Sequence, residues 1–479
     1  MSDAPTAALA TSLHRRWGGS TSGRAPLAVA VSVCAAPLLA VAGVIGPPQL
    51  VLAVVLVLAL LVFGSPSAWL MTSLVVASGS GLLRRLLAGS SGRIDNDPLV
   101  VLPFVLMLAA FVLSPARLSG DGKARSSRDW SPLFALIPTV ILASITVTGR
   151  FSTLQLYAAM TQTAVWLVII GIYRGRIPNV WPAAQRALPI IALVAGTYGI
   201  VQFLVLPDWD MAWMISSDLT SIGRPEPFQV RIFGMSESPG PFAALLGIGI
   251  IGCTQRAISG QRSAAPLWVL SGLALIGPLV LTGVRLAILA LAASILFLGF
   301  RGATGIRRFL PLIFLVATGG AVSEAVARFG GSSSILTSDR LTQFNASTDG
   351  SLQARIGLLD RIPAALSRPF GSTDGEARLD NLVFDVLANY GPLAALLVVS
   401  ALVVVSGRVL RAPAGTPHAD SAGASVVFLL VFSLGANLFI SSTGVVAALA
   451  IGAVMQEGAN RSEGAETRKF ARGARRTTH

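Results

Sequence analysis

The stretch DNLVFDVLANYGPLAALLVVSALVVVS, Asp380 to Ser406, decides the fold class of this chain. Its second half carries no charge, and the whole stretch exceeds the roughly 20 residues that a helix needs to cross a bilayer. Its first half spaces Asn381, Asp385 and Asn389 so that a helix presents all three side chains on one face. The stretch therefore predicts a membrane-spanning helix with one polar face.

The rest of the chain shares this apolar character. Of the 479 residues, 53% are hydrophobic and 12% are charged, whereas soluble proteins carry about 25% charged residues. Because apolar runs recur along the chain, we predict an all-α polytopic membrane protein with about 12–14 transmembrane helices. The predicted spanning segments are 26–45, 49–64, 68–83, 99–115, 133–149, 154–173, 188–207, 242–258, 267–283, 285–300, 309–323, 382–406, 425–441 and 442–455.

Positive charge lies mostly in short loops between the apolar segments. The formal net charge is +14, but this distribution is typical of membrane topology and does not predict nucleic-acid binding. If the N-terminus is cytoplasmic, the basic loops at 117–128, 174–186, 256–262, 301–308 and 408–411 all fall on the cytoplasmic side. Arg84 and Arg85 are the exception, because the same topology places them outside.

We expect one transmembrane domain, residues 26–455, between a cytoplasmic N-terminal tail, 1–25, and a basic cytoplasmic C-terminal tail, 456–479. No small-residue cleavage site follows a short apolar core near the start, so a removable signal peptide is not expected. Two longer connections, 208–241 and 325–380, fall on the predicted external face. Long ordered loops between helices often carry function.

Arginines recur on this external face, where the charge rule expects few. Arg285, in LTGVRLAILAL, opens a helix with almost no loop before it. A lipid-facing guanidinium is costly, so we expect Arg285 to face the bundle interior or a water-filled cavity, the alternative being an interfacial arginine that reaches the head groups. The other external arginines include Arg224, Arg231, Arg340, Arg355, Arg361 and Arg368.

Two external motifs carry most of these arginines. In VRIFGMSESPGPFAALL, Arg231 and the only acid of the turn, Glu237, precede a helix whose free N–H groups would favour an anion; the alternative is a plain helix start with a capping acid. In SLQARIGLLDRIPAALSRPFGST, apolar residues recur at helical spacing and predict an amphipathic helix on the outer leaflet, ended or kinked by Pro363. Its arginines would lie near lipid head groups or simply in solvent.

Clustered external arginines indicate an anionic ligand, because arginine binds phosphate bidentately and stays charged when partly buried. A lipid diphosphate fits, with its head group at the interface and its tail between helices. Cys34 and Cys253 lie in apolar segments, and no cluster of Asp, His or Cys offers a metal site. We therefore expect neither a metal nor another cofactor.

The order of these motifs resembles the O-antigen ligase and O-antigen polymerase family of bacterial membrane glycosyltransferases. The matching pieces lie between about Leu188 and Met455: RIFGMSESPGPFAALL, LTGVRLAILAL, SLQARIGLLDRIPAALSRPFGST and DNLVFDVLANYGPLAALL. The resemblance implies a multi-pass protein of the bacterial cytoplasmic membrane, active on its external face. It would transfer a saccharide from an undecaprenyl-diphosphate-linked donor to an acceptor hydroxyl, with inversion and without a metal.

By position, the resemblance implies that Arg231, Arg285 and Arg355 hold the diphosphate, and Arg361 and Arg224 are further candidates on the same face. The ligase branch usually has a His where this chain has Asp380, which favours a polymerase. Asp380 would be a general base or orient the acceptor, with an N-cap role as the alternative, and Glu237 is the other candidate catalytic acid or base. Asn381, Asp385 and Asn389 would contact sugar hydroxyls or hydrogen-bond between helices.

Two other function classes stay open at the level of sequence. One is a transporter or flippase for an anionic lipid or solute, although no internal repeat is visible. The other is a non-catalytic subunit of polysaccharide assembly. The sequence leaves open the sugar, the acceptor (a glycan, a lipid or the cell wall) and the oligomeric state; beyond donor and acceptor, the only partners expected are membrane lipids.

Overall fold

The computed structural model describes residues 65–89, 97–114, 129–149, 153–217, 222–259, 263–302, 310–329, 357, 360–371, 381–412, 416–439 and 441–476. Of these residues, 82% are helical and none lies in a strand, which confirms the all-α prediction. Among the described helices, seven are long and apolar enough to cross a membrane, in agreement with a polytopic membrane protein. The predicted segments 26–45 and 49–64 lie outside the described residues, as do Arg340, Arg355 and Asp380.

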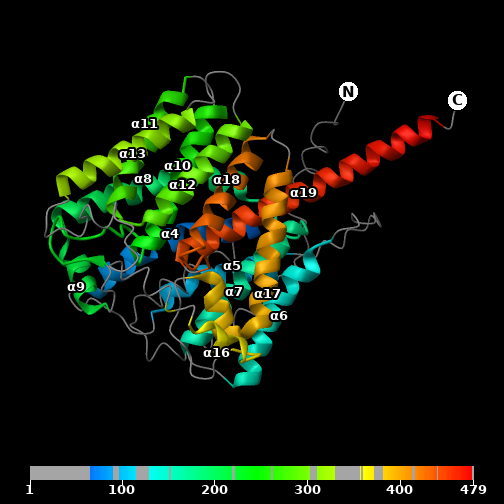
Figure 1. Ribbon diagram of the computed structural model, residues 1–479, viewed down its shortest axis with the longest axis horizontal. Coiled ribbons are helices and arrows are strands. Elements are labelled where there is room, and N and C mark those ends of the chain that lie inside the picture. Colours follow the sequence, from blue (N-terminus) through cyan, green and yellow to red (C-terminus); the bar gives the residue numbers. More distant parts are fainter. Residues whose placement is uncertain are drawn as a thin grey trace, which may run out of the picture. The chain divides into compact units, whose positions relative to one another are not determined.

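The described helices follow most of the predicted segments closely (Figure 1). Their bounds are α4 Pro66–Ala88, the short 3-10 helix η3 Pro98–Val100, α5 Leu102–Leu113, α6 Ser131–Thr148, α7 Thr153–Tyr173, α8 Trp181–Val205, α9 Asp208–Ser216, α10 Pro239–Ser259, α11 Ala265–Leu281, α12 Arg285–Gly302, α13 Leu310–Phe329, α16 Ile362–Leu366, α17 Leu382–Arg411, α18 Pro417–Phe432 and α19 Ser441–Arg476.

The predicted segment 425–441 is wrong at both ends. α18 begins at Pro417, because the Thr416 hydroxyl caps it by accepting the N–H of Ala419 at 3.3 Å and Pro417 fits the first turn. The helix ends at Phe432, and a turn follows. Residues before 425, which the sequence analysis left outside the helix, belong to α18, and the polar Asp420 among them is buried.

The helix α10 forms the centre of the bundle and contacts α8, α11, α12 and α18. Its glycines allow this close packing: a Cβ at Gly247 would lie 2.4 Å from the Phe428 ring, and a Cβ at Gly249 would lie 2.4 Å from the Ala192 methyl. Small residues let membrane helices approach in this way, since packing rather than hydrophobic burial holds them together.

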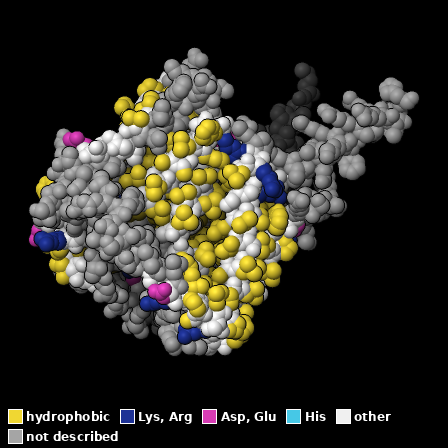
Figure 2. All heavy atoms as spheres, in the orientation of Figure 1, with side chains coloured by type: hydrophobic (Ala, Val, Ile, Leu, Met, Phe, Trp, Pro, Cys, Tyr) yellow, Lys and Arg dark blue, Asp and Glu magenta, His cyan; other side chains and the backbone are white. Residues whose placement is uncertain are grey.

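The outward faces of several helices are strongly apolar. Figure 2 shows hydrophobic side chains over much of the face on which α12 and α17 lie. Exposed examples come from α8, α11, α12 and α17: Ile190, Val194, Leu267, Leu270, Leu289, Phe300, Leu396, Val403 and Leu410. Soluble monomers rarely expose contiguous apolar patches of this kind, whereas lipid-facing helices require them.

The loops predicted to be cytoplasmic contact one another at one end of the bundle. Arg174 Nη2 donates to Ser131 Oγ at 2.6 Å, and Arg301 Nη1, at the end of α12, donates to the Val409 carbonyl at 2.8 Å. Thr416, between α17 and α18, bonds Glu457 of α19 at 3.0 Å. The described parts of these loops therefore share an end of the bundle; that this end faces the cytoplasm stays a prediction.

The helix α17 is broken within the stretch from Asp380 to Ser406. Gly391 has φ 88° and ψ 174°, and Pro392 after it has no N–H to continue the helix. The Pro369–Gly371 segment lies against this break, where the Ser144 hydroxyl of α6 also donates to the Phe370 carbonyl at 2.6 Å. The predicted single continuous helix is thus two helical pieces with a loop docked between them.

In the connection after α13, Pro363 lies in the first turn of α16. Most of the predicted amphipathic helix, which carries Arg355, lies outside the described residues.

Candidate functional site

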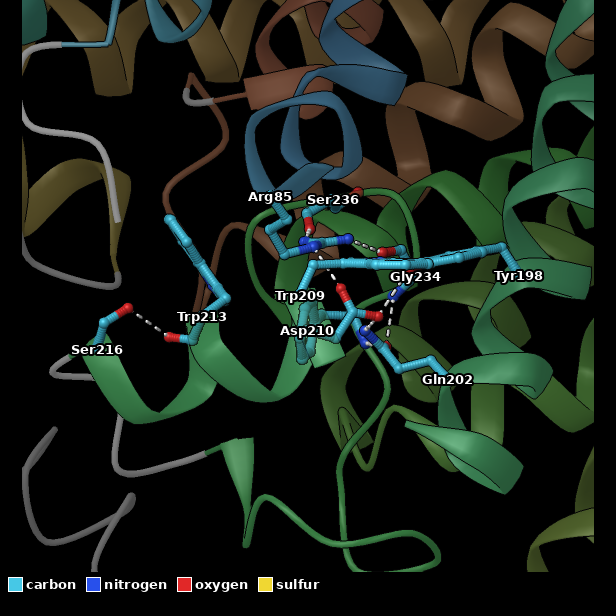
Figure 3. Close-up of polar contacts among 10 residues, drawn as sticks. Arg85, Tyr198, Gln202, Trp209, Asp210, Trp213, Ser216, Gly234 and Ser236 are labelled. Carbon is cyan, nitrogen blue, oxygen red and sulfur yellow. Dashed lines mark hydrogen bonds and ion pairs between the residues drawn. The ribbon is translucent and has the colours of Figure 1, made fainter. Parts of the chain in front are cut away.

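A buried polar cluster lies at the end of α4, where Arg85 meets the 231–237 segment (RIFGMSE) that precedes α10 (Figure 3). Arg85 is fully buried, and its Nε lies 2.6 Å from Asp210 Oδ1 of α9, without the alignment of a hydrogen bond. Nη1 donates to the Ser236 carbonyl at 2.6 Å, and Nη2 donates to the Gly234 carbonyl. The guanidinium also stacks over the Phe233 ring, 4.7 Å from its centroid.

The second carboxylate oxygen of Asp210 is held by α8. Tyr198 and Gln202 each donate to Oδ2 at 2.8 Å, and Trp209 donates from its indole N–H to the Tyr198 hydroxyl at 2.8 Å. Figure 3 shows these side chains converging on Asp210 from α8 and α9. Asp210 is fully buried, so each of these donors offsets part of the cost of removing its charge from water.

The backbone of the 231–237 segment is held from two sides. Gln202 Oε1 accepts the N–H groups of both Phe233 and Gly234, at 2.8 and 3.0 Å. From the opposite side, the Leu82 N–H of α4 donates to the Met235 carbonyl at 3.0 Å. Hydrogen bonds to α8 and to α4 therefore hold the backbone of residues 233–235 between these two helices.

Arg84, the neighbour of Arg85, joins two further acids to the cluster. Its Nε lies 2.7 Å from Asp97 Oδ2, and its Nη1 lies 2.8 Å from Glu237 Oε1. Three carboxylates, those of Asp97, Asp210 and Glu237, therefore face two guanidinium groups. This compensation explains how two arginines can lie at the end of the bundle where the charge rule expects few.

Arg231 and the turn before Arg285 come together next to this cluster. Arg231 Nε donates to the Thr282 carbonyl at 2.9 Å, and a Cβ at Gly283 would lie 3.0 Å from the same nitrogen. The N–H of Ile232 donates to the Leu281 carbonyl at 3.3 Å. Two predicted phosphate-binding arginines, both half-buried, thus belong to segments in direct contact.

The start of α10 offers less to an anion than the sequence analysis expected. Pro239 and Pro241 have no N–H, and the N–H of Phe242 donates to the Ser238 carbonyl at 3.4 Å. Of the first four residues of α10, at most Gly240 can present a backbone donor. The prediction of several free N–H groups is therefore wrong, and an anion here would depend on side chains.

The polar face of α17 lies within the bundle and meets the turn after α18. Asn381 caps the helix by accepting the N–H groups of two residues in its first turn, and its amide donates to the Ser433 carbonyl at 3.2 Å. Asp385 is buried and accepts from Asn389 at 3.1 Å and from Asn437 at 3.0 Å. The predicted shared face is present, and it makes hydrogen bonds within α17 and to the turn after α18; contact with a sugar stays a prediction.

The other candidate arginines lie in the turn before the 231–237 segment and at the ends of α16. Arg224 is exposed in the turn before this segment, where its N–H donates to the Gln229 carbonyl at 3.2 Å. Arg361 and Arg368 are exposed at either end of α16, which packs against α17.

Sequence reasoning missed the Arg85–Asp210 pair. One signal was present, because an ionisable residue within an apolar helix is a functional-site candidate by default. Arg84 and Arg85 end such a helix, and the same predicted side carries Asp97, Asp210 and Glu237. The partners themselves could not be assigned, since they come from segments far apart in the chain.

Comparison with known proteins adds no family assignment. No protein-family profile matches the chain, and a search of curated proteins gives no match. The resemblance to the O-antigen ligases and polymerases accordingly depends on the motifs alone and stays a prediction.

Proposed function

We propose that this protein is a membrane glycosyltransferase, a glycan polymerase or ligase that uses a polyprenyl-diphosphate-linked donor. The contact of Arg231 with the turn before Arg285 is the observation that carries the proposal. Two guanidinium groups on touching segments form a suitable place for a diphosphate, whose negative charge offsets their mutual repulsion. We place this site on the external face of the bacterial cytoplasmic membrane.

The proposed reaction is an inverting substitution. An acceptor hydroxyl oxygen forms a bond to the anomeric carbon of the donor, while the bond from that carbon to the diphosphate oxygen breaks. The diphosphate leaves with the bonding electron pair, and Arg231, Arg285 and Arg355 stabilise its developing charge. The hydroxyl proton passes to a base, for which Asp380 and Glu237 are the candidates.

The acceptor sugar would lie near the polar face of α17. Asn381, Asp385 and Asn389 begin this face next to the predicted external connection that ends at 380. Amides and carboxylates are suitable partners for sugar hydroxyls. The Asn381 amide already donates to backbone carbonyls, so a role in acceptor binding would depend mainly on Asp385 and Asn389.

Arg285→Ala tests the proposal in purified protein reconstituted with an undecaprenyl-diphosphate-linked oligosaccharide. We expect transfer to fall by about 100-fold or more, as when a single donor to developing charge is removed. Arg301→Ala is the matched control, because Arg301 lies at the opposite end of the same helix. Full transfer by correctly inserted Arg285→Ala protein would refute the proposal.

A flippase or transporter is the second candidate, and the break in α17 favours it. Discontinuous helices near the middle of the membrane form the substrate sites of many transporters. The same reconstituted vesicles separate the two functions, because a flippase would move the labelled lipid between leaflets without forming a new glycosidic bond.

A further inference from the structure

The Arg85–Asp210 pair is a poor way to stabilise a protein. Both side chains are 0% accessible to solvent, so each charge bears the full cost of desolvation. Buried ion pairs often contribute no more stability than a well-packed apolar pair. The two facing atoms are also not aligned as a hydrogen bond. A role other than stability accounts better for charges in this position.

The contacts of the pair indicate that role. Arg85 touches the 231–237 segment in three ways, through the carbonyls of Gly234 and Ser236 and through the Phe233 ring. α4 approaches this segment so closely that a Cβ at Gly81 would lie 2.5 Å from the Ser236 carbonyl carbon. Only a glycine allows such an approach, so the backbones of α4 and the segment are in direct contact at Gly81.

Asp210 fixes the guanidinium from the other side. Its Oδ1 faces Arg85, while Tyr198 and Gln202 hold its Oδ2. Gln202 also accepts two N–H groups of the 231–237 segment, so the pair and the segment share one hydrogen-bond network. This network reaches the backbone at Phe233, two residues after Arg231.

We propose that Arg85 and Asp210 are positioning residues, which hold the 231–237 segment so that Arg231 faces the diphosphate of a lipid-linked substrate. The inference rests on the proposed function, because it takes Arg231 to contact that diphosphate. Neither Arg85 nor Asp210 touches the substrate in this proposal. Both act through the backbone that carries Arg231.

The double variant Arg85→Met/Asp210→Leu tests the inference, because it replaces the ion pair with apolar side chains of similar size. We expect the thermal midpoint to fall, because the change also removes the partners of the Gly234 and Ser236 carbonyls and of the Tyr198 and Gln202 donors. The kinetics are therefore measured on folded, inserted protein. We expect kcat/KM for the lipid-linked donor to fall about 100-fold, the effect of a displacement of about 1 Å at a reacting group. The KM for the acceptor should not change.

The matched control is Arg174→Met/Asp129→Leu, an ion pair of 3.4 Å between exposed side chains at the opposite end of the bundle. It receives the same substitutions and should leave the thermal midpoint, kcat/KM for the donor and KM for the acceptor unchanged. Asp210→Asn is a second variant in case the double variant does not insert. It keeps the shape and the acceptor for Tyr198 but removes the charge facing Arg85.

A double-mutant cycle decides whether the pair acts through Arg231. Arg231→Ala should cost little further activity in the Arg85→Met/Asp210→Leu background, because Arg231 is already displaced. Fully multiplicative losses, or wild-type kinetics in the double variant, would overturn the inference.

Binding of undecaprenyl diphosphate is measured in parallel with transfer. If wild type binds this lipid but transfers no glycan, the proposed glycosyltransferase function fails, and weaker binding by the double variant still supports the positioning role. If the double variant binds as tightly as wild type, or wild type does not bind at all, the positioning role fails.

Discussion

At the scale of single residues, the sequence predicted which side chains share a face but not what they touch. The spacing of Asn381, Asp385 and Asn389 placed them together correctly because helix geometry alone decides it. Their partner Asn437 lies 52 residues after Asp385, and no local rule links the two. The same holds for Arg85 and Asp210, whose contact depends on how α4, α8 and α9 pack.

Asp385 offers a test at this scale. Its carboxylate accepts from two amide groups, those of Asn389 and Asn437, and an amide in its place would present a donor to at least one of them. We expect Asp385→Asn to cost about 1–3 kcal/mol of stability, the usual penalty for a buried polar group left without a partner. Thermal unfolding in detergent measures this loss, with Asp208→Asn at the exposed start of α9 as the control. An unchanged midpoint would show that the buried contact can rearrange.

At the scale of helices, apolar length predicted most elements, and caps and special backbone geometry account for the failures. The segment predicted at 154–173 is α7, Thr153–Tyr173, because the apolar run has clear polar limits. α18 was misplaced because a Thr cap and Pro at its start outweigh a polar first turn. The break in α17 was missed because Gly and Pro are common in membrane helices without breaking them.

Gly391 provides the test at the scale of helices. It has φ 88°, and an added Cβ would lie 2.2 Å from the Pro369 carbonyl oxygen, so Gly391→Ala must displace the docked Pro369–Gly371 segment. We expect a loss of at least about 1–2 kcal/mol from the left-handed backbone alone. Trypsin should then cleave faster after Arg361, which is exposed at the start of α16.

Gly407→Ala is the control on the same helix. A Cβ at Gly407 meets no atom within 4 Å, so this change should be neutral or stabilise α17 slightly. If Gly391→Ala shows the midpoint and the cleavage rate of Gly407→Ala, the segment is not docked in the break.

At the scale of the whole molecule, the charge pattern predicted which loops lie together. Arg174, Arg301 and the residues around Thr416 make their contacts at one end of the bundle, as the positive-inside rule required. Arg84 and Arg85 are the exception to that rule, and the structure explains them by three neighbouring carboxylates. The rule counts charges along the chain, so it cannot detect neutralisation by residues from distant segments.

The direction of insertion is the remaining prediction at this scale, and single cysteines test it. In a background that lacks Cys34 and Cys253, Phe228→Cys reports on the predicted external connection and Arg411→Cys on a predicted cytoplasmic loop; both positions are exposed. A membrane-impermeant maleimide should label Phe228→Cys in intact cells and Arg411→Cys only after lysis. Because the described parts of the basic loops share one end, a single reversed result would invert the whole topology. The Arg231–Arg285 site would then face the cytoplasm, where an externally acting polymerase or ligase could not use it.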